Sequence, residues 1–457
     1  MARTDSLEHF LTDAAAAIRL KSGISAQMNS NEMINNINSW TSESVRDYVI
    51  NEVIDEDRGS DDASIEVAFF NSIPETYFNY LMNTTTNLSY AFSEFYALSN
   101  INNLIPSKPI DNIYNCFYSC RNLISLDLSK WNLVNNLDSG RVFSSCKNLR
   151  TISLPNDIIL RDPWSAFYNC ENLIFLNGRN IKVYNDAGSL FSSCKNLDFK
   201  CLENWNLYPT TSLSYAFTNS GLTNINFFTN KIFNTRNIMH MFVGCKNLEL
   251  DTSLNFNFWN ANDCSGLFMD CSKITSFMPQ YFDIGQANSL QGFFMSCSSL
   301  TSVSFDNMNI QNVQNLSSMF ANCNKLESVG GISFVSPIGE ITNVYGMFSN
   351  CRNLNSVSYG WMQQIFGNTN LNTIDRMFAN CHNLSITSIG TILQFIKGLN
   401  VSRFNISSLN LSNKRSGSPF YNTNINLTNE EFLTELTVDG SFQRSEVEEL
   451  TQRGWTF

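Results

Sequence analysis

Twelve phenylalanines recur between residues 92 and 378, at intervals of 24–30 residues, and each belongs to the same short motif. In most copies a Cys follows the Phe after three residues and an aliphatic residue follows after six. The twelve are Phe92, Phe117, Phe143, Phe167, Phe191, Phe217, Phe242, Phe268, Phe294, Phe320, Phe348 and Phe378. A period of this length, sustained so long, is typical of a solenoid whose copies stack on their neighbours. The chain is therefore predicted to be an α/β repeat protein, and its extended surface favours a role in binding.

The residues around Phe320 show what each copy is expected to form. Leu316, Met319, Phe320 and Cys323 are spaced i, i+3, i+4 and i+7, which predicts a short helix with one apolar face. Polar residues after Cys323 predict a turn, and the aliphatic residues from Leu326 onward predict a strand. One such unit cannot bury its apolar face alone, so neighbouring copies must stack.

The pattern divides the chain into four predicted parts. Residues 1–60 are predicted to be a small helical attachment module with an acidic linker, and residues 61–86 a cap on the solenoid. Residues 87–390 hold about 12 repeats, and residues 391–457 form a helical C-terminal cap. The apolar positions of the first module are candidate docking residues: Leu7, Phe10, Leu11, Ile18, Ile34 and Ile37.

Three helices are expected near the C-terminus. Isoleucines and a leucine at helical spacing predict one from residue 386 to about Gly398. A second is predicted to open with a capping box from Thr428 to Glu431, and a third to span residues 444–452.

Ten of the thirteen cysteines occupy the same slot of the repeat, three residues after Phe. In the other two copies this slot holds Phe95 and Ser220, so the position does not require a disulfide. The three remaining cysteines leave an odd total with no paired pattern. We therefore predict reduced thiols that pack as small buried hydrophobic groups.

Composition excludes several functions. A net charge of −11, with only 15% charged residues, argues against binding to a nucleic-acid backbone. No apolar run reaches the roughly 18 residues that span a bilayer, and residues 1–5 do not open an apolar signal core, so neither membrane insertion nor export is expected. Three dispersed histidines give no metal-ligand spacing, and no catalytic motif is found; no cofactor, metal or enzymatic activity is expected.

The repeat resembles the BspA-type leucine-rich repeats. The sequences Met-Phe-Ala-Asn-Cys-Asn-Lys-Leu at residues 319–326 and Met-Phe-Ala-Asn-Cys-His-Asn-Leu at residues 377–384 carry the resemblance, together with the strand and Trp-Asn of residues 123–132. It covers about two-thirds of the chain and implies a solenoid. For function it implies either a surface adhesin of bacteria and protists or a phage structural protein.

Two end segments resemble modules of phage tail and baseplate proteins. Residues 11–23 are similar to their N-terminal helix with Ala-Ile-Arg followed by Lys and Gly, and residues 446–456 to their closing Lys-Gly-Trp-Thr unit. Here Arg453 stands where Lys is usual. The resemblance implies a virion protein at the tail, baseplate or an appendage. The alternative is a bacterial cell-surface adhesin.

Alternate residues of the predicted strands are expected to point away from the core. They are mainly hydroxyl and amide side chains, which can hydrogen-bond a sugar or a peptide, with two phenylalanines as stacking surfaces. The structural alternative, which needs no ligand, is a solvated ladder of Ser and Thr. The candidate ligand-facing residues are Ser125, Asp127, Thr151, Ser153, Phe175, Asn177, Phe199, Asn224, Ser302, Ser304, Ser328 and Ser356.

The predicted partners follow from these parts. In the virion interpretation the N-terminal module joins other virion proteins, and the repeats meet a host-surface glycan or protein or a neighbouring virion protein. Several copies per particle, or a homo-oligomer, would raise avidity for a weak ligand.

Overall fold

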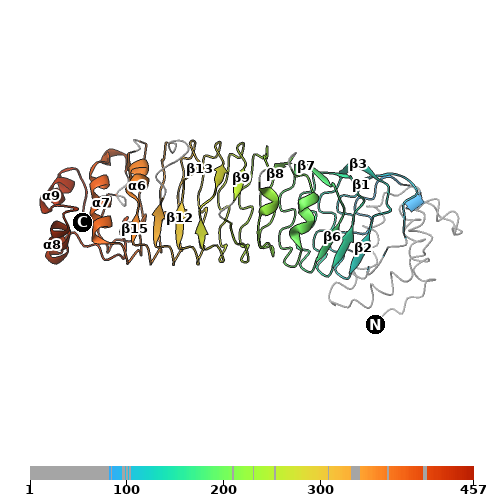
Figure 1. The fold of residues 1–457 in the computed structure, drawn as a ribbon, viewed down its shortest axis with the longest axis horizontal. Helices are drawn as coiled ribbons and strands as arrows, with labels where there is room; N and C mark the ends of the chain where they lie inside the picture. Colours follow the sequence, from blue (N-terminus) through green and yellow to red (C-terminus); the bar gives the residue numbers. More distant parts are fainter. Residues whose placement is uncertain are drawn as a thin grey trace, which may run out of the picture. The chain divides into compact units, whose positions relative to one another are not determined.

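A computed structural model describes residues 82–83, 85–94, 98, 101, 104–207, 210–229, 231–251, 254–306, 308–330, 340–367, 370–404 and 409–457. The candidate docking residues Leu7 to Ile37 lie outside these ranges. The chain divides into two compact units: residues 1–184 with 194–206, and residues 185–193 with 207–457. Each unit is a stack of parallel strands and turns, so the predicted solenoid is confirmed (Figure 1).

The segment around each repeat phenylalanine is a pair of tight turns. In all twelve copies the residues two before and two after Phe have positive φ, as Ser318 (55°) and Asn322 (64°) do around Phe320. Met319 N–H donates to the Leu316 carbonyl and Cys323 N–H to the Phe320 carbonyl, closing turns of four residues. A positive φ at the third residue is what a type II turn requires.

The short helix predicted for each repeat is therefore wrong. Chained four-residue turns place apolar side chains on one side at nearly the spacing of a helix, so the apolar pattern alone could not separate the two. The separating signal was the residue type at the two left-handed positions, which are often Gly, Asn, Asp or Ser, as at Gly292 and Ser296. Glycine and asparagine enter the left-handed region at low cost, whereas a helix interior disfavours them.

The turns also join neighbouring copies through the backbone. Every second N–H across the segment donates to the next copy, as from Ser318 to Tyr345, Phe320 to Met347 and Asn322 to Ser349, at 2.8–2.9 Å. The repeat phenylalanines stack behind this ladder with ring centroids 5.1–5.8 Å apart from Phe92 to Phe167, and 5.4–5.9 Å apart from Phe191 to Phe420. All of them are buried.

A polar residue five positions before each Phe starts the turns. It is Asn, Asp, Ser or Thr in all twelve copies. Its side-chain oxygen accepts the N–H two residues on, as from Tyr345 to Asn343 Oδ1 (2.8 Å) and Ser265 to Asp263 Oδ1 (2.9 Å). Such short side chains satisfy a nearby backbone donor and fix a turn. This slot was a further signal for turns that the apolar spacing did not show.

All ten slot cysteines donate a hydrogen bond to the preceding copy. Each Sγ lies 2.9–3.1 Å from the carbonyl oxygen of the preceding Phe, as Cys323 does from Phe294. All thirteen thiols are free, which confirms the expectation of reduced cysteines, and all but the partly exposed Cys201 are buried. Burial raises the pKa of Cys201, Cys245 and Cys323 to about 12.

Short parallel strands follow the turns in the first unit. One sheet has the order β2-β4-β6, and the other runs β1-β3-β5-β7. The strands are β1 (Ile110–Asn112), β2 (Ser125–Asp127), β3 (Leu133–Asp138), β4 (Thr151–Ser153), β5 (Ile159–Arg161), β6 (Phe175–Asn177) and β7 (Lys182–Asp186); the 3₁₀ helix η3 (Phe199–Asn204) follows. Each copy thus places one strand in each sheet, with the apolar core between them.

The second unit repeats this arrangement. Its sheets have the orders β10-β12-β14-β15 and β13-β11-β9, and the last residues of β7 pair with β8. The elements are β8 (Thr210–Ser212), η4 (Asn226–Phe228), β9 (Asn255–Asn257), β10 (Ser276–Phe277), β11 (Tyr281–Asp283), β12 (Ser302–Ser304), β13 (Met308–Asn309), β14 (Ser328–Gly330) and β15 (Ser356–Val357). Figure 1 shows the later strands of this unit lying side by side, with helices following at the C-terminal end.

The described residues of the second unit form four α-helices. Helix α7 (Ile386–Lys397) ends at Gly398 and α9 (Arg444–Gln452) spans 444–452, as predicted. Helix α8 (Glu430–Asp439) also forms, but its cap is Asn429, which accepts the N–H of Glu431 and Phe432; the predicted Thr428–Glu431 box is wrong. Helix α6 (Tyr359–Phe366) and the 3₁₀ helix η5 (Val401–Arg403) were not predicted.

A thirteenth copy of the turn segment follows α7. Phe378 N–H donates to the Pro419 carbonyl, and the Phe420 ring stacks on Phe378 at 5.9 Å. Asn422 has positive φ, two residues after Phe420, and its amide donates to Asn380. The sequence period missed this copy because α7 lies inside the interval and Thr423 replaces Cys.

The C-terminal segment closes this end of the second unit. Thr456 pairs with Asn410, and Trp455 is 1% exposed with its ring 5.9 Å from Phe404. Gly454 supplies the positive φ (96°) that turns the chain into this position. A covered end is what a solenoid requires, because an open end exposes its core.

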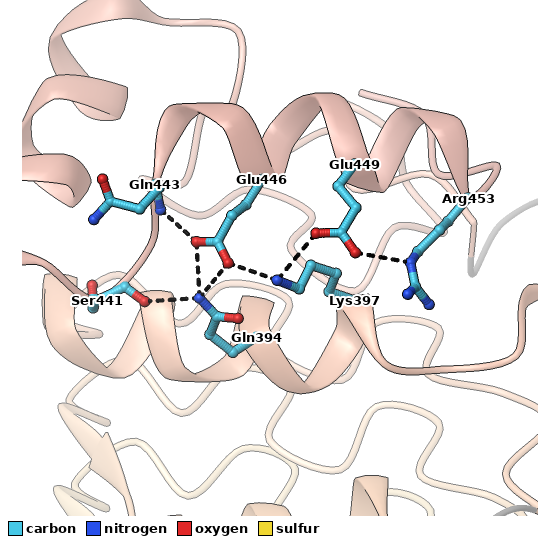
Figure 2. A network of polar contacts seen from close by, with 7 residues as sticks. All are labelled: Gln394, Lys397, Ser441, Gln443, Glu446, Glu449 and Arg453. Carbon is cyan, nitrogen blue, oxygen red and sulfur yellow. Dashed lines mark hydrogen bonds and ion pairs between the residues drawn. The ribbon is translucent and has the colours of Figure 1, made fainter.

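A polar network holds α9 on α7 (Figure 2). Lys397 Nζ lies 2.6 Å from Glu446 Oε1 and 3.3 Å from Glu449 Oε2, and Gln394 donates to Glu446 at 2.9 Å. Burial alone would raise the pKa of Glu446, but hydrogen bonds from Lys397, Gln443 N–H and Gln394 outweigh it and the pKa is lowered. The bond to Glu446 likewise raises the pKa of Lys397.

The left-handed turn positions can be tested with two glycines of the second unit. Gly346 has φ +58°, and a new Cβ would make only ordinary contacts, with Ser318 Oγ at 3.7 Å and Ser349 Cβ at 3.8 Å. Gly346→Ala should therefore lower the free energy of unfolding by about 1 kcal/mol through backbone strain alone. Gly330, in β14, has an ordinary φ and a Cβ would meet only Val303 O at 3.7 Å. Urea unfolding of Gly330→Ala should show no loss; equal losses for both would contradict the turn model.

Thiol reactivity tests the burial of the cysteines. With pKa values near 12 at Cys245 and Cys323, against about 8.5 for a free thiol, iodoacetamide at pH 8 should label the folded protein far more slowly than the urea-unfolded chain. Cys201 should react first because it is partly exposed. Ser298→Cys places a thiol on an exposed turn and serves as the fast control. Rapid labelling of Cys323, read by mass spectrometry, would refute the buried slot.

The network between α7 and α9 makes stability depend on pH. Because the pKa of Glu446 is lowered on folding, its contribution is present above its unfolded pKa of about 4.5 and is lost as pH falls through the folded value. Glu446→Gln should cost about 1–2 kcal/mol at pH 7, and the cost should shrink below pH 4. Thermal unfolding of Glu435→Gln, an exposed residue of α8, should match the wild type; a pH-independent cost at Glu446 would argue against the ion pair.

Candidate binding surface

Two columns of outward side chains cross the sheet β2-β4-β6. Ser125 pairs with Thr151 and Thr151 with Phe175, while Asp127, Ser153 and Asn177 align in the same way. Between these columns lie Leu126, Ile152 and Leu176, each at most 4% exposed. Because strand side chains alternate between faces, the predicted outward residues of these three strands do face away from the core. Phe175 is 55% exposed.

The sheet β10-β12-β14-β15 carries a similar column in the second unit. Ser276, Ser302, Ser328 and Ser356 are paired in register and partly exposed, over the buried column of Phe277, Val303, Val329 and Val357. Ser304 lies opposite Gly330, and its hydroxyl donates to Asp306 Oδ2 at 2.8 Å. The predicted serines are thus brought together along one surface.

Two of the predicted residues do not belong to a strand. Phe199 begins η3 and is only 8% exposed, so it offers no stacking surface, and Asn224 is exposed but precedes η4. In both places a short polar side chain accepts an N–H two residues on: Asp198 from Lys200 and Asn224 from Asn226. This local bond starts a 3₁₀ turn where the repeat would otherwise form a strand.

The columns are polar and nearly uncharged. Asn177 donates to Ser153 Oγ at 3.4 Å, and Ser129 N–H donates to Asp127 Oδ1 at 2.9 Å. Hydrogen bonds from Ser129 lower the pKa of Asp127, which therefore stays ionised. Such a surface can exchange hydrogen bonds with a ligand but holds no strong nucleophile.

The described ranges hold no group of three or more His, Cys, Asp or Glu side chains placed to bind a metal ion. His240 packs edge-on against Tyr215 at 4.9 Å, and burial lowers its pKa. The helices of the described part are too short or too polar to cross a membrane.

Partly exposed aromatic residues on the turn segments were not among the sequence-predicted candidates. In the first unit Tyr114, Tyr118 and Trp164 lie near Arg141. The signal that could have found them is an aromatic residue three before or one after the repeat Phe in neighbouring copies, as at Trp164 and Tyr168 around Phe167.

Two solved structures resemble the chain at low identity. A leucine-rich repeat protein from Bacteroides ovatus is 18% identical, with a TM-score of 0.37, over 65% of this chain and 74% of that one. A leucine rich cell surface protein from Faecalibacterium prausnitzii is 17% identical, with a TM-score of 0.27, over 57% of this chain and 86% of that one. No curated protein matches the sequence.

Two family models match the sequence. Residues 276–391 match a family described as a Mycoplasma protein of unknown function, DUF285. Residues 63–198 and 115–249 match the BspA type leucine rich repeat region. These matched stretches contain the turn segments from Phe92 to Phe242 and their strands. The match to the BspA type leucine rich repeat model thus spans residues 63–249.

Proposed function

We propose that the chain is a non-catalytic binding protein of the cell-surface adhesin type, which contacts its ligand through the outward strand columns. The observation that carries this proposal is the register of those columns. Ser125, Thr151 and Phe175 form one in the first unit, and the four serines from Ser276 to Ser356 form one in the second. The BspA-type repeats of residues 63–249 support it.

The columns suit a repetitive ligand that binds weakly at each copy and contacts many copies at once. Successive copies are about 4.8 Å apart, so each adds another hydroxyl or amide along the surface. Hydroxyl and amide groups exchange hydrogen bonds with sugar hydroxyls or with a peptide backbone, and Phe175 adds an apolar face. Many small contacts along one array sum to useful avidity. The ligand class is therefore a surface glycan or protein.

A second candidate is a phage virion component. What favours it is the resemblance of residues 11–23 and 446–456 to phage tail and baseplate modules. The closing Trp455 and Gly454 act as a cap within the second unit, a role that either kind of protein needs. The repeat region itself supports the adhesin, whereas only the two end segments support the virion component.

Charge placed in the serine column tests the ligand surface. Ser328→Arg puts a long cation between Ser302 and Ser356 and should reduce binding to a glycan array and to intact cells at least tenfold, because the column loses its uncharged donors. Asn324→Arg makes the same charge change on an exposed turn of the same copy. If the two variants bind equally and their unfolding midpoints are unchanged, the serine column is not part of the ligand surface.

Location separates the adhesin from the virion protein. Immunogold electron microscopy with an antibody against residues 90–380 is applied to intact cells and to phage lysates. Gold on uninfected cell envelopes supports the adhesin, whereas gold on particle tails with bare cells supports the virion component.

A further inference from the structure

The turn segments of the first unit bring two aromatic rings together across an intervening copy. Tyr114, Gly140 and Trp164 occupy the same slot, three residues before Phe, in consecutive copies. Copies one apart are separated by about 4.8 Å, so the two aromatic residues start about 9.6 Å apart. Their ring centroids nevertheless lie 6.3 Å apart, tilted by 51°. The rings therefore lean toward each other above Gly140.

Glycine is needed at position 140 because of the space that these rings occupy, and not because of its backbone conformation. Its φ lies outside the left-handed region, so another residue could adopt its conformation. A Cβ at this position would lie 2.9 Å from Trp164 Nε1 and 3.0 Å from two Tyr114 ring atoms. The glycine thus keeps open the space that the leaning rings fill.

Arg141 lies beside these rings with its charge uncompensated. Its guanidinium carbon is 4.5 Å from the Tyr118 ring centroid and 5.6 Å from that of Trp164. No carboxylate in the described part of the chain forms an ion pair with it. Arg141 also has φ 53°, a conformation that favours Gly or Asn, so its side chain is retained at the expense of backbone strain.

Asn115 provides a second polar group in this region. It occupies the slot of Arg141 in the preceding copy and is 4% exposed, and its Oδ1 has no hydrogen-bond partner. A buried acceptor without a partner is rare and points to a missing donor. We call Tyr114, Tyr118, Arg141, Trp164 and Asn115 the aromatic patch.

We propose that the aromatic patch binds an acidic sugar, a pyranose that carries a carboxylate. The apolar C–H face of the sugar packs on the partly exposed Tyr114 and Trp164 rings, whose π faces attract its weakly positive hydrogens. Its carboxylate accepts two parallel hydrogen bonds from the planar guanidinium of Arg141, which two aromatic rings hold in place.

Charge and shape favour this ligand over others. The Arg141 guanidinium, ring-stacked on an otherwise acidic chain, favours a small anion, whereas the net negative charge repels a polyanion. Two tilted rings give a shallow surface that matches the flat face of one pyranose. The patch lies on the turn segments, away from the strand columns, so it does not depend on the function proposed for them.

The test uses calorimetric titration of the full chain with four probes. Sialic and uronic acids share the required chemistry and are represented by 3′-sialyllactose and a galacturonic acid trimer; lactose is the neutral match, and a hepta-glutamate peptide represents a protein carboxylate. At least one acidic sugar should bind tenfold or more tightly than lactose. Equal binding of lactose, no binding of any sugar, or binding of the peptide alone would overturn the proposal.

Variants then assign the binding to the patch. Arg141→Asn introduces a residue already found in this slot at Asn115, so the fold should be kept while affinity for the acidic sugar falls about tenfold. Arg150→Asn removes the same charge from an exposed position outside the patch and should leave affinity unchanged. Gly140→Ala, which displaces the rings, should also weaken binding. Gly188→Ala, in the same slot of a copy without these rings, should not. Equal losses for Arg141→Asn and Arg150→Asn would refute the site.

Discussion

The backbone ladder between neighbouring turn segments is the interaction on which the rest of the structure depends. Each copy exposes N–H and C=O groups along its turns, and these find partners only in the next copy, as between Phe320 and Met347. The ladder fixes the spacing of the copies, and that spacing lets the phenylalanines stack at 5.1–5.9 Å. It also lets each slot thiol reach the preceding carbonyl. A free turn segment has none of these contacts, so the fold is cooperative between neighbours.

The sequence predicted the features that recur from copy to copy and the helices with clear apolar spacing. The twelve-fold period predicted the solenoid, the shared Cys slot predicted buried thiols, and helical spacing located α7 and α9 closely. It failed where two structures share one pattern, because the spacing of Leu316, Met319 and Phe320 suits chained turns as well as a helix. Phe420 was missed because its copy follows an inserted helix. Short local bonds at Asp198 and Asn224 overrode the strand pattern in two copies.

The strand residues of the candidate surface could also be predicted from the sequence, but the aromatic patch could not. Alternation along a strand is a property of the backbone, so the outward side of Ser125, Phe175 and Ser328 followed from counting alone. The aromatic patch could not be found that way, since its members lie apart in sequence and meet only through the stacking of copies. Tyr114 and Trp164 approach because the slot between them holds glycine. An alignment of consecutive copies, compared position by position, would have placed these two residues in the same column.

Several positions with a left-handed backbone hold residues that this conformation disfavours. Glycine and asparagine satisfy these turns at low cost, yet the slot two residues before Phe holds Tyr90, Arg141, Tyr215, His240 and Arg376. Each costs roughly 1 kcal/mol of strain. Four have an evident contact in return: Tyr90 packs on Tyr114, Tyr215 and His240 on each other, and Arg376 donates to Ser416. Arg141 contacts two rings but leaves its charge without a carboxylate. The cation–π contacts account for a charged side chain at this position, and they leave its N–H groups available to an anion. Its guanidinium is thus the ring-stacked cation of the turn surface to which the proposed acidic sugar would bind.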